Sequence, residues 1–245
     1  MRIDILTLFP EMFEAVLKES IIGRAVERQL LELEFHNIRD YSDNKHRKVD
    51  DYPYGGGLGM IMQCQPIFAA AEAIKTKLGE KPYTVLMSPR GKTFDQSKAK
   101  ELSTYKYLTV ICGHYEGIDE RVTEVLVDEE ISIGDFVLTG GEIAAMAVVD
   151  AACRFIPGVL KEDASYVDES FNDGLLEYPQ YTRPPVFMGL EVPEVLLSGH
   201  HENIEKWRRQ QSLKRTYERR PDLLSQADLS EEDLKFLDKI KRECK

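Results

Sequence analysis

The sequence predicts an α/β domain with a mostly parallel sheet, followed by a small helical domain. Over the first 160 residues, short β-rich runs alternate with helical patterns, an order typical of parallel strands joined by helices. A polar stretch at 161–174 then has the composition of a linker, and helical patterns follow it. We therefore expect a first domain at 1–160, a flexible linker at 161–175 and a helical domain at 176–245.

Each predicted strand is a short run rich in β-branched, aromatic or other apolar residues. The first covers 3–8, and a helix follows Pro10. Further buried strands are expected at 32–38, 83–88, 107–113 and 131–135.

Helical patterns lie between these strands at 66–78, 95–102 and 117–127. The segment 142–156 is apolar nearly all round, so we expect a buried helix there. Near the C-terminus, Ser230 followed by Glu232 and Asp233 resembles a capping box. It would open a final amphipathic helix that carries Leu234, Leu237 and Ile240.

The composition limits the class of protein. Of the 245 residues, 42% are apolar, which suits a globular chain with a core. No apolar run reaches the roughly 18 residues of a membrane span, and the N-terminus is too short and too acidic for a signal peptide. The four scattered cysteines argue against a zinc site or a disulfide framework. We expect a cytoplasmic protein.

Three glycine-bearing segments follow predicted strands: SPRGKT at 88–93, CGHYEGIDER at 112–121 and SIGDFVLTGGE at 132–142. Ligands of open α/β sheets bind beyond the carboxyl ends of the strands, and glycines let the backbone approach them. Each segment alone could be an ordinary turn. Together they predict a composite site for a small, nucleoside-like cofactor. Tyr115 could stack on it and Glu116 could hold ribose hydroxyls or face a cation, although both could also be ordinary surface residues.

The charge of the chain is unevenly distributed. The net charge is -11, which argues against nonspecific coating of nucleic acid. The segment 203–220, however, carries seven basic residues and only two acidic ones. It is either a contact for a polyanionic partner or a solvated helix face.

Longer sequence blocks carry a resemblance to a known family. These blocks are LTLFPEMF, DDYPYGGGLGM, SPRG, GHYEGIDERV, ISIGDFVLTGGE, RFIPGVL, GLLEYPQYTRP, and VLLSGHH followed by WRRQQSLKRTYERRPDLL. In them the chain resembles the bacterial tRNA (guanine-N1-)-methyltransferases, the TrmD family, collinearly over nearly its whole length.

The resemblance implies a fold, a reaction and an assembly. The fold is of the SPOUT type, in which the C-terminal part of the α/β domain forms a trefoil knot. The reaction transfers a methyl group from S-adenosylmethionine to N1 of the guanine at tRNA position 37. The family works as a homodimer whose active sites are shared between protomers.

The resemblance also implies a cofactor site made mostly of backbone groups. Its residues lie in the three glycine-bearing segments and just before the first of them. They are Leu86, Ser88, Pro89, Gly113, Tyr115, Glu116, Gly117, Ser132, Ile133, Gly134, Asp135, Phe136, Val137, Leu138, Gly140 and Gly141.

Methylation of guanine N1 requires a base for the N1 proton and a donor for the charge that gathers on O6. The resemblance assigns the donor to Arg154, although Asp150, four residues earlier, could instead hold that arginine in an ion pair. The base falls in VDESF, where the family usually has Asp directly before Ser-Phe. Glu169 takes that place here, and Asp168 is the alternative. Either carboxylate could also be a solvated linker charge.

The remaining implied contacts are to RNA. They involve His46, Asp50 and Ser165, and four cations of the helical domain that would hold phosphates: Arg208, Arg209, Lys214 and Arg215. The sequence encodes no metal site, so the magnesium associated with this family would be held by substrate or cofactor.

Two other interpretations compete with this one. A SPOUT methyltransferase with another RNA target is disfavoured, because the linker and the basic C-terminal domain resemble the guanine-N1 branch. Only the Glu169 substitution favours a catalytically silent RNA-binding relative, and Arg154 and the three glycine-bearing segments argue against it.

Overall fold

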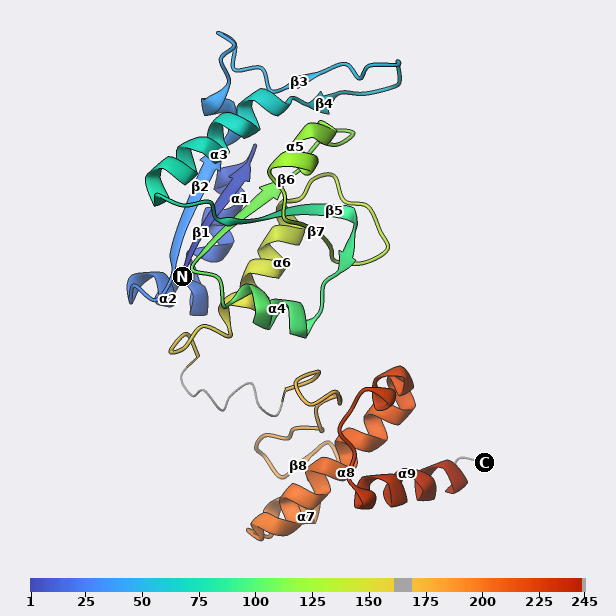
Figure 1. Cartoon of the computed structure of the whole chain (residues 1–245). Coiled ribbons are helices and arrows are strands. Elements are labelled where there is room, and N and C mark those ends of the chain that lie inside the picture. The colour runs from blue at the N-terminus through green and yellow to red at the C-terminus, as the bar shows by residue number, and fades with distance from the viewer. Residues whose placement is uncertain (161–168, 244–245) are drawn as a thin grey trace. The chain divides into compact units, whose positions relative to one another are not determined.

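The computed structural model describes residues 1–160 and 169–243, which form two compact units, Met1–Lys161 and Glu162–Lys245 (Figure 1). Within the described residues, no helix is long and apolar enough to cross a membrane.

A five-stranded parallel sheet is the centre of the N-terminal unit. Its strand order is β2-β1-β6-β5-β7, with every neighbouring pair parallel. The strands are β1 (Arg2–Thr7), β2 (Glu32–Asn37), β5 (Tyr83–Thr93), β6 (Tyr107–Cys112) and β7 (Glu129–Ser132). The α/β class and the parallel sheet predicted from the alternating patterns are thereby confirmed.

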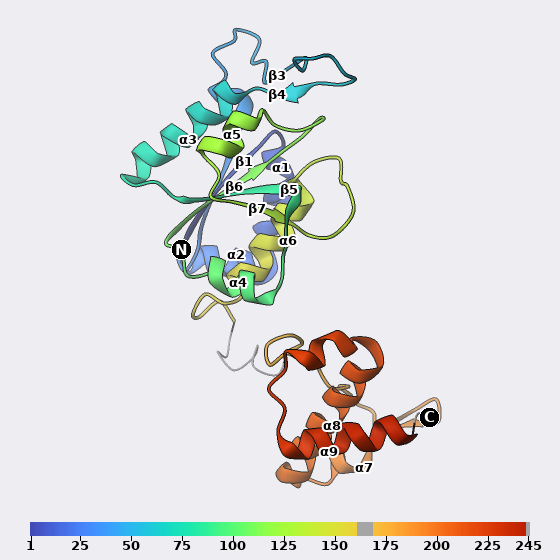
Figure 2. The same ribbon diagram turned by 45° about the vertical axis from the view of Figure 1, so that its right-hand side comes forward.

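Helices cover both faces of the sheet (Figure 2). One buried cluster joins one face to α1 (Pro10–Leu17), α2 (Ser20–Glu27), α4 (Gln96–Leu102) and α6 (Glu142–Cys153). The other joins the opposite face to α3 (Cys64–Leu78), α5 (Glu120–Val125) and the 3-10 helix η1 (Ile38–Tyr41). A short hairpin of β3 (Asp50–Asp51) and β4 (Ile61–Met62) adds to the second side.

Local signals explain several element ends. The Asp95 side chain accepts a hydrogen bond from the Lys98 amide at 2.8 Å and opens α4. Helix α3 ends at Gly79, whose φ of 77° lies in the left-handed region that favours glycine.

Two expectations need correction. Helix α6 is not buried all round, because Ile143 and Ala147 on one face are exposed. The segment 88–93 is not a loop after a strand, because β5 continues to Thr93. A second pairing with β7 begins at Lys92 and includes Thr93, after a register shift beyond Met87.

The C-terminal unit is mostly helical. It contains the hairpin β8 (Val186–Phe187) and β9 (Leu190–Glu191), α7 (Glu194–Leu197), α8 (His201–Arg219), the 3-10 helix η3 (Pro221–Ser225) and α9 (Glu231–Glu243). Leu175, Leu213 and Leu237 form the centre of its core.

The predicted capping box opens α9. The Ser230 hydroxyl accepts from the Asp233 amide at 3.2 Å, and the Asp233 carboxylate accepts from the Ser230 amide at 3.0 Å. Leu237 and Ile240 of this helix are buried as its amphipathic pattern predicts, whereas Leu234 is exposed.

Candidate functional site

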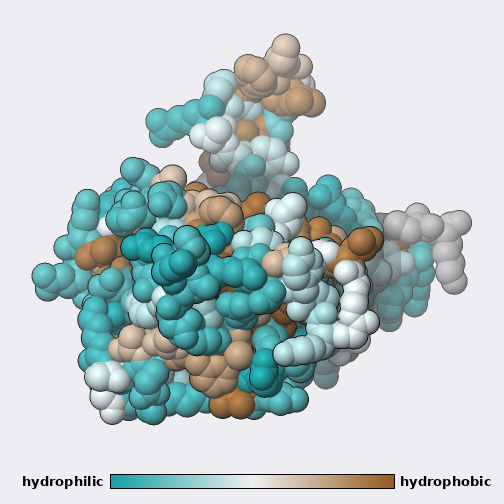
Figure 3. Space-filling view, turned by 90° about the horizontal axis from the view of Figure 1, so that it is seen from above, coloured by the Kyte–Doolittle hydropathy of each residue, from teal (hydrophilic) through white to brown (hydrophobic). Residues whose placement is uncertain are grey.

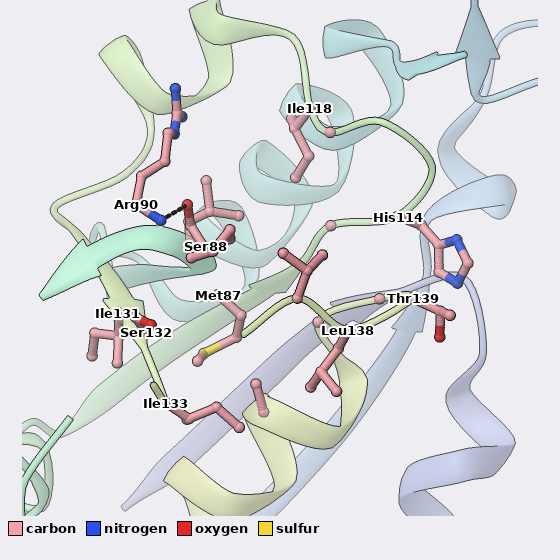
Figure 4. Close-up of a pocket in the computed structure, with 18 of the residues that line it drawn as sticks. Met87, Ser88, Arg90, His114, Ile118, Ile131, Ser132, Ile133, Leu138 and Thr139 are labelled. Carbon is pink, nitrogen blue, oxygen red and sulfur yellow. Dashed lines mark hydrogen bonds between the residues drawn. The ribbon is translucent and has the colours of Figure 1, made fainter. Parts of the chain in front are cut away.

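A cavity of about 440 Å³ lies beside residues 86–90 of β5 and the ends of β6 and β7, and α5 and the start of α6 complete its wall (Figure 4). This volume falls in the range of small-molecule sites. Most of the lining is backbone and apolar side chains, including Leu86, Ile118 and Leu138. All described lining residues belong to the N-terminal unit.

The first wall is a bulge in β5. Met87 and Lys92 both align with Ile131 of β7, so the residues between them project out of the sheet. A side chain at Gly91 would collide with the backbone of Glu130, because the strand returns to β7 there. The bulge thus presents 88–90 to the cavity, which a regular strand could not do.

The second wall is the loop after β6. Tyr115 has a φ of 59° and Gly117 a φ of 136°, so the loop turns sharply through the left-handed region. Strand β4 fixes it from outside, because the Met62 amide donates to the Gly117 carbonyl at 2.9 Å and the Glu116 amide donates to the Met60 carbonyl at 3.0 Å.

The third wall is the loop from β7 to α6. It leaves the edge of the sheet and returns past the end of β5 to β6, where the Gly141 amide donates to the Gly113 carbonyl at 2.9 Å. A Cβ at Gly141 would lie 2.9 Å from the Cys112 Cα atom, so only glycine permits this approach. Gly140 pairs with His114 beside it, and Figure 4 shows the His114 ring next to Thr139.

Charged groups of the lining are few. Arg90 pairs with Glu120 at 3.1 Å and with Glu130 at 3.3 Å, and these carboxylates raise the pKa of its guanidinium. Glu116 is exposed at the loop after β6. The cavity therefore has carboxylates on its rim and no fixed excess of positive charge, an arrangement that suits a cationic ligand.

Two side chains next to the cavity, Cys112 and Glu142, are buried. Burial raises the pKa of the Cys112 thiol well above its ordinary value. Glu142 is buried, and it accepts a hydrogen bond from the Thr7 hydroxyl at 2.9 Å, which ties the start of α6 to β1.

The structure brings together nearly all residues that the resemblance implies for the cofactor. Every one of them lines the cavity except Asp135, which is exposed in the loop after β7. Sequence reasoning missed further lining residues: Met87, Arg90, His114, Ile118, Glu120, Thr123, Ile131, Thr139 and Ala144. His114 stands inside the GHYEG block, which is a usable signal, whereas Glu120 and Thr123 face the cavity only because α5 packs there.

Of the implied catalytic residues, Arg154 is the one that lies in the same unit as this cavity. Arg154 is the C-terminal cap of α6, ten residues beyond Ala144 of the lining, or roughly 15 Å along a helix axis. Glu169 belongs to the C-terminal unit, and Asp168 lies outside the described residues.

The implied RNA contacts of the N-terminal unit lie near the β3–β4 hairpin. His46 is exposed before β3, and Asp50 is half-buried within it. Ser165 lies outside the described residues.

The implied phosphate contacts of the C-terminal unit differ in their surroundings. Arg209 donates to Asp233 at 2.9 Å and to Asp173 at 2.6 Å, so it ties α8 to α9 and to the segment before Leu175. Arg208 lies over the Tyr178 ring, and Arg215 donates to a backbone carbonyl at 3.3 Å. Lys214 is exposed and lies 4.0 Å from the Glu218 carboxylate.

Comparison with known proteins gives a consistent result. A family model described as tRNA (Guanine-1)-methyltransferase TrmD matches residues 1–226. A tRNA (guanine-N(1)-)-methyltransferase of Clostridium novyi is 60% identical over 243 residues, covering 99% of each chain. Proteins of the same name from Ruminiclostridium cellulolyticum and Dehalococcoides mccartyi are 60% and 56% identical, over 92% and 98% of this chain and 97% of each relative.

Proposed function

This chain belongs to the tRNA (guanine-1)-methyltransferase TrmD family, and on that premise we propose that it methylates N1 of the guanine at position 37 of tRNA. The observation that carries the proposal is the family match over 1–226. The cavity beside residues 86–90 of β5 and the ends of β6 and β7 supports it, because the three family segments meet there.

The methyl donor we propose is S-adenosylmethionine, and the cavity fits it. The backbone groups of the three walls can read an adenine edge, and Leu86, Ile118 and Leu138 offer apolar contact. Glu116 and Glu120 on the rim suit a positively charged ligand. The cofactor would supply a methyl group already activated by its sulfonium.

The side chains of this protein would then accept the proton from guanine N1 and stabilise the negative charge that develops on O6. We assign the base to Glu169, whose carboxylate takes the proton from guanine N1. The guanidinium of Arg154 donates to O6, where negative charge gathers as that proton leaves. Asp168 remains the alternative base.

We also propose that two copies complete each site. Arg154 lies at the end of α6 remote from the cavity of its own chain, so another chain has to bring an arginine to it. Large apolar side chains on the same side of the unit are exposed, among them Met12 and Val16 of α1 and Ile143 of α6. Helices α1 and α6 contact each other, so these residues can form one surface for a homodimer.

Two further features of the family are proposed for this chain. One is the SPOUT trefoil knot, which the return of the chain from β7 past β5 to β6 supports. The other is magnesium held by substrate or cofactor. Within residues 1–160 and 169–243, no three His, Cys, Asp or Glu side chains gather as a metal site.

The test is single-turnover methylation of a guanine-37 tRNA transcript by the wild type, Glu169→Gln and Asp168→Asn, with S-adenosylmethionine binding measured in parallel. We expect loss only in Glu169→Gln, with cofactor binding retained. Loss only in Asp168→Asn would move the base by one residue. A wild type that binds cofactor and tRNA without methylating would favour the silent RNA-binding relative.

A further inference from the structure

An arginine outside the cavity is bonded to a residue that lines it. The Arg39 guanidinium donates a hydrogen bond to the Tyr115 hydroxyl at 3.2 Å, across 76 positions of sequence. Tyr115 lines the cavity in the loop after β6, whereas Arg39 belongs to η1 and is not part of the lining. Among the described residues, Arg39 forms no ion pair with a carboxylate, so the Tyr115 hydroxyl is the partner of its guanidinium.

Tyr115 is a residue that needs support from its surroundings. Its φ of 59° lies in the left-handed region, which a bulky residue keeps only where neighbouring contacts hold it. The residue is 41% exposed, and its ring meets the His114 ring edge-on with 5.4 Å between centroids. The outer end of the ring is therefore held by the hydrogen bond to Arg39.

The surface around this loop is polar. The loop after β6 lies at the end of the N-terminal unit toward which the parallel strands β1, β2 and β6 run. Figure 3 views the unit from this end, and the near surface is mostly hydrophilic with small, separate apolar patches. A surface of this kind offers an exposed ring little apolar packing, so a directed hydrogen bond contributes more to fixing the ring.

Helix η1, which carries Arg39, is held at both ends. Ile38 is fully buried in the cluster that joins η1 to α3. The Asn37 side chain accepts from the Arg39 amide at 3.0 Å and opens the helix. At the other end, the Gln65 side chain of α3 donates to the Tyr41 carbonyl at 3.2 Å.

A chain of polar groups also fixes η1 to the sheet. The Tyr41 hydroxyl is hydrogen-bonded to Nδ1 of His36 at 2.9 Å, and Nε2 of that ring is hydrogen-bonded to the fully buried Asp4 carboxylate at 2.7 Å. The chain runs from β1 through β2 to η1, and the proposed chemistry uses none of its groups. A connected network of this kind rigidifies the elements that it joins, so η1 is a firm support for Arg39.

We propose that Arg39 is a positioning residue, which holds the Tyr115 ring at the edge of the cavity in the orientation that S-adenosylmethionine requires. The inference rests on the proposed function and adds to it a residue outside the cavity lining. Loss of the bond would free the ring to rotate about its side-chain torsions, and a ligand would have to restrict that motion again on binding. Cofactor affinity would then fall although the lining itself is unchanged.

The test compares Arg39→Ala, Tyr115→Phe and the double variant with Arg47→Ala. Arg47 is a matched control, because it is an exposed arginine close in sequence that pairs with Asp40 at 3.0 Å and does not line the cavity. Affinity for S-adenosylmethionine is measured by calorimetry without RNA. Arg39→Ala and Tyr115→Phe should each bind about 3- to 10-fold more weakly than wild type. The double variant should be no weaker than the weaker single variant, and Arg47→Ala should match wild type.

A probe on the ring separates positioning from stability. With 3-fluorotyrosine in place of Tyr115, fluorine NMR of the cofactor-free protein reports the surroundings of the ring. The signal should shift toward that of free 3-fluorotyrosine in Arg39→Ala and stay unchanged in Arg47→Ala. The melting temperature should be the same in both variants, because Arg39 acts on one side chain and not on the core.

Additive losses of affinity in the double variant would overturn the inference, because Arg39 would then affect the cofactor by a route other than Tyr115. A ring signal that Arg39→Ala leaves unchanged would overturn it as well. The ring signal requires neither bound cofactor nor turnover. A wild type that fails to bind S-adenosylmethionine would contradict the proposed function, while a shifted ring signal in Arg39→Ala would still support the positioning of Tyr115 by Arg39.

Discussion

Single glycines decide how closely the walls of the cavity approach one another. Gly141 brings the start of α6 against the end of β6, with the position of a Cβ 2.9 Å from the Cys112 Cα atom and 3.1 Å from the Gly113 amide nitrogen. Its φ of -78° is ordinary, so its need for glycine comes from space alone. Contacts of this kind are rigid, because backbone on both sides has to move to relieve them.

Gly141→Ala should separate the second and third walls and weaken S-adenosylmethionine binding by tenfold or more. Isothermal titration calorimetry checks this. Gly79→Ala is the matched control, because it strains a left-handed residue at the end of α3, away from the cavity. If the two variants bound the cofactor with equal affinity, the walls would have adapted to the added methyl group. Gly141 would then be required for packing and not for cofactor binding.

The carboxyl group of Asp4, away from the cavity, has a pKa that its neighbours shift. It is fully buried in β1, which raises its pKa, but hydrogen bonds from Arg2 at 2.8 Å and His36 at 2.7 Å lower it, and the net shift is downward. A carboxyl whose pKa is lower in the folded state stabilises the protein above its unfolded pKa of about 3.9 and loses that effect as pH falls through the folded value.

Removal of this carboxylate should therefore change how the free energy of unfolding depends on pH in the acidic range. Asp4→Asn should be less stable than wild type at pH 7, and the difference should shrink below about pH 4 as the wild type becomes protonated. Urea unfolding at several pH values measures this. A difference that is constant down to pH 2 would show that Asp4 acts by shape and not by charge.

Element ends and helix contacts hold the C-terminal unit together. The Ser230–Asp233 cap and the Arg209–Asp233 ion pair meet at the start of α9, so Asp233 serves both. The pKa of Asp233 is below its ordinary value despite partial burial, because Arg209 and Ser230 both donate to it. At least one basic residue of α8, Arg209, thus makes a structural contact.

Basic residues of α8 should separate by role. Arg209→Ala should destabilise the C-terminal unit by removing its link to α9, seen as a lower melting temperature. Lys214→Ala should leave melting unchanged and reduce the salt slope of tRNA binding by about one. Arg209→Lys keeps the charge and tests whether the contacts of the guanidinium with both Asp233 and Asp173 contribute beyond that charge. If Lys214→Ala lowered the melting temperature as much as Arg209→Ala, the division would be wrong.

At the scale of the whole molecule, the proposed role of Arg154 leads to the proposal of a homodimer, because Arg154 lies remote from the cavity of its own chain. If sites are shared, one protomer brings Arg154 and another brings the cofactor cavity. Mixtures of inactive variants can then regain function, because a mixed dimer contains one site with both groups intact.

Mixing Arg154→Ala with Glu169→Gln should restore part of the methylation that each variant lacks, if the two groups of one site come from different chains. Single-turnover methylation after unfolding and refolding the mixture together measures this. Ile143→Asp, which charges the exposed face of α6, should yield monomers without activity but with a folded N-terminal unit, as seen by sedimentation and circular dichroism. An active monomer would contradict the shared site.

The sequence by itself determined the element types, because periodicity, caps and turn residues act within a few positions of one another. It predicted the parallel sheet, the cap at Ser230 and, through its family blocks, the larger part of the cavity lining. Only the tertiary structure decided the strand order, the bulge that keeps 88–93 in β5, and the approach of Glu120 and Thr123 to the cavity. It also decided that Arg209 pairs with Asp233 and that Arg154 lies remote from the cavity of its chain. These facts depend on contacts between residues far apart in the sequence, and local patterns carry no record of which distant segments become neighbours.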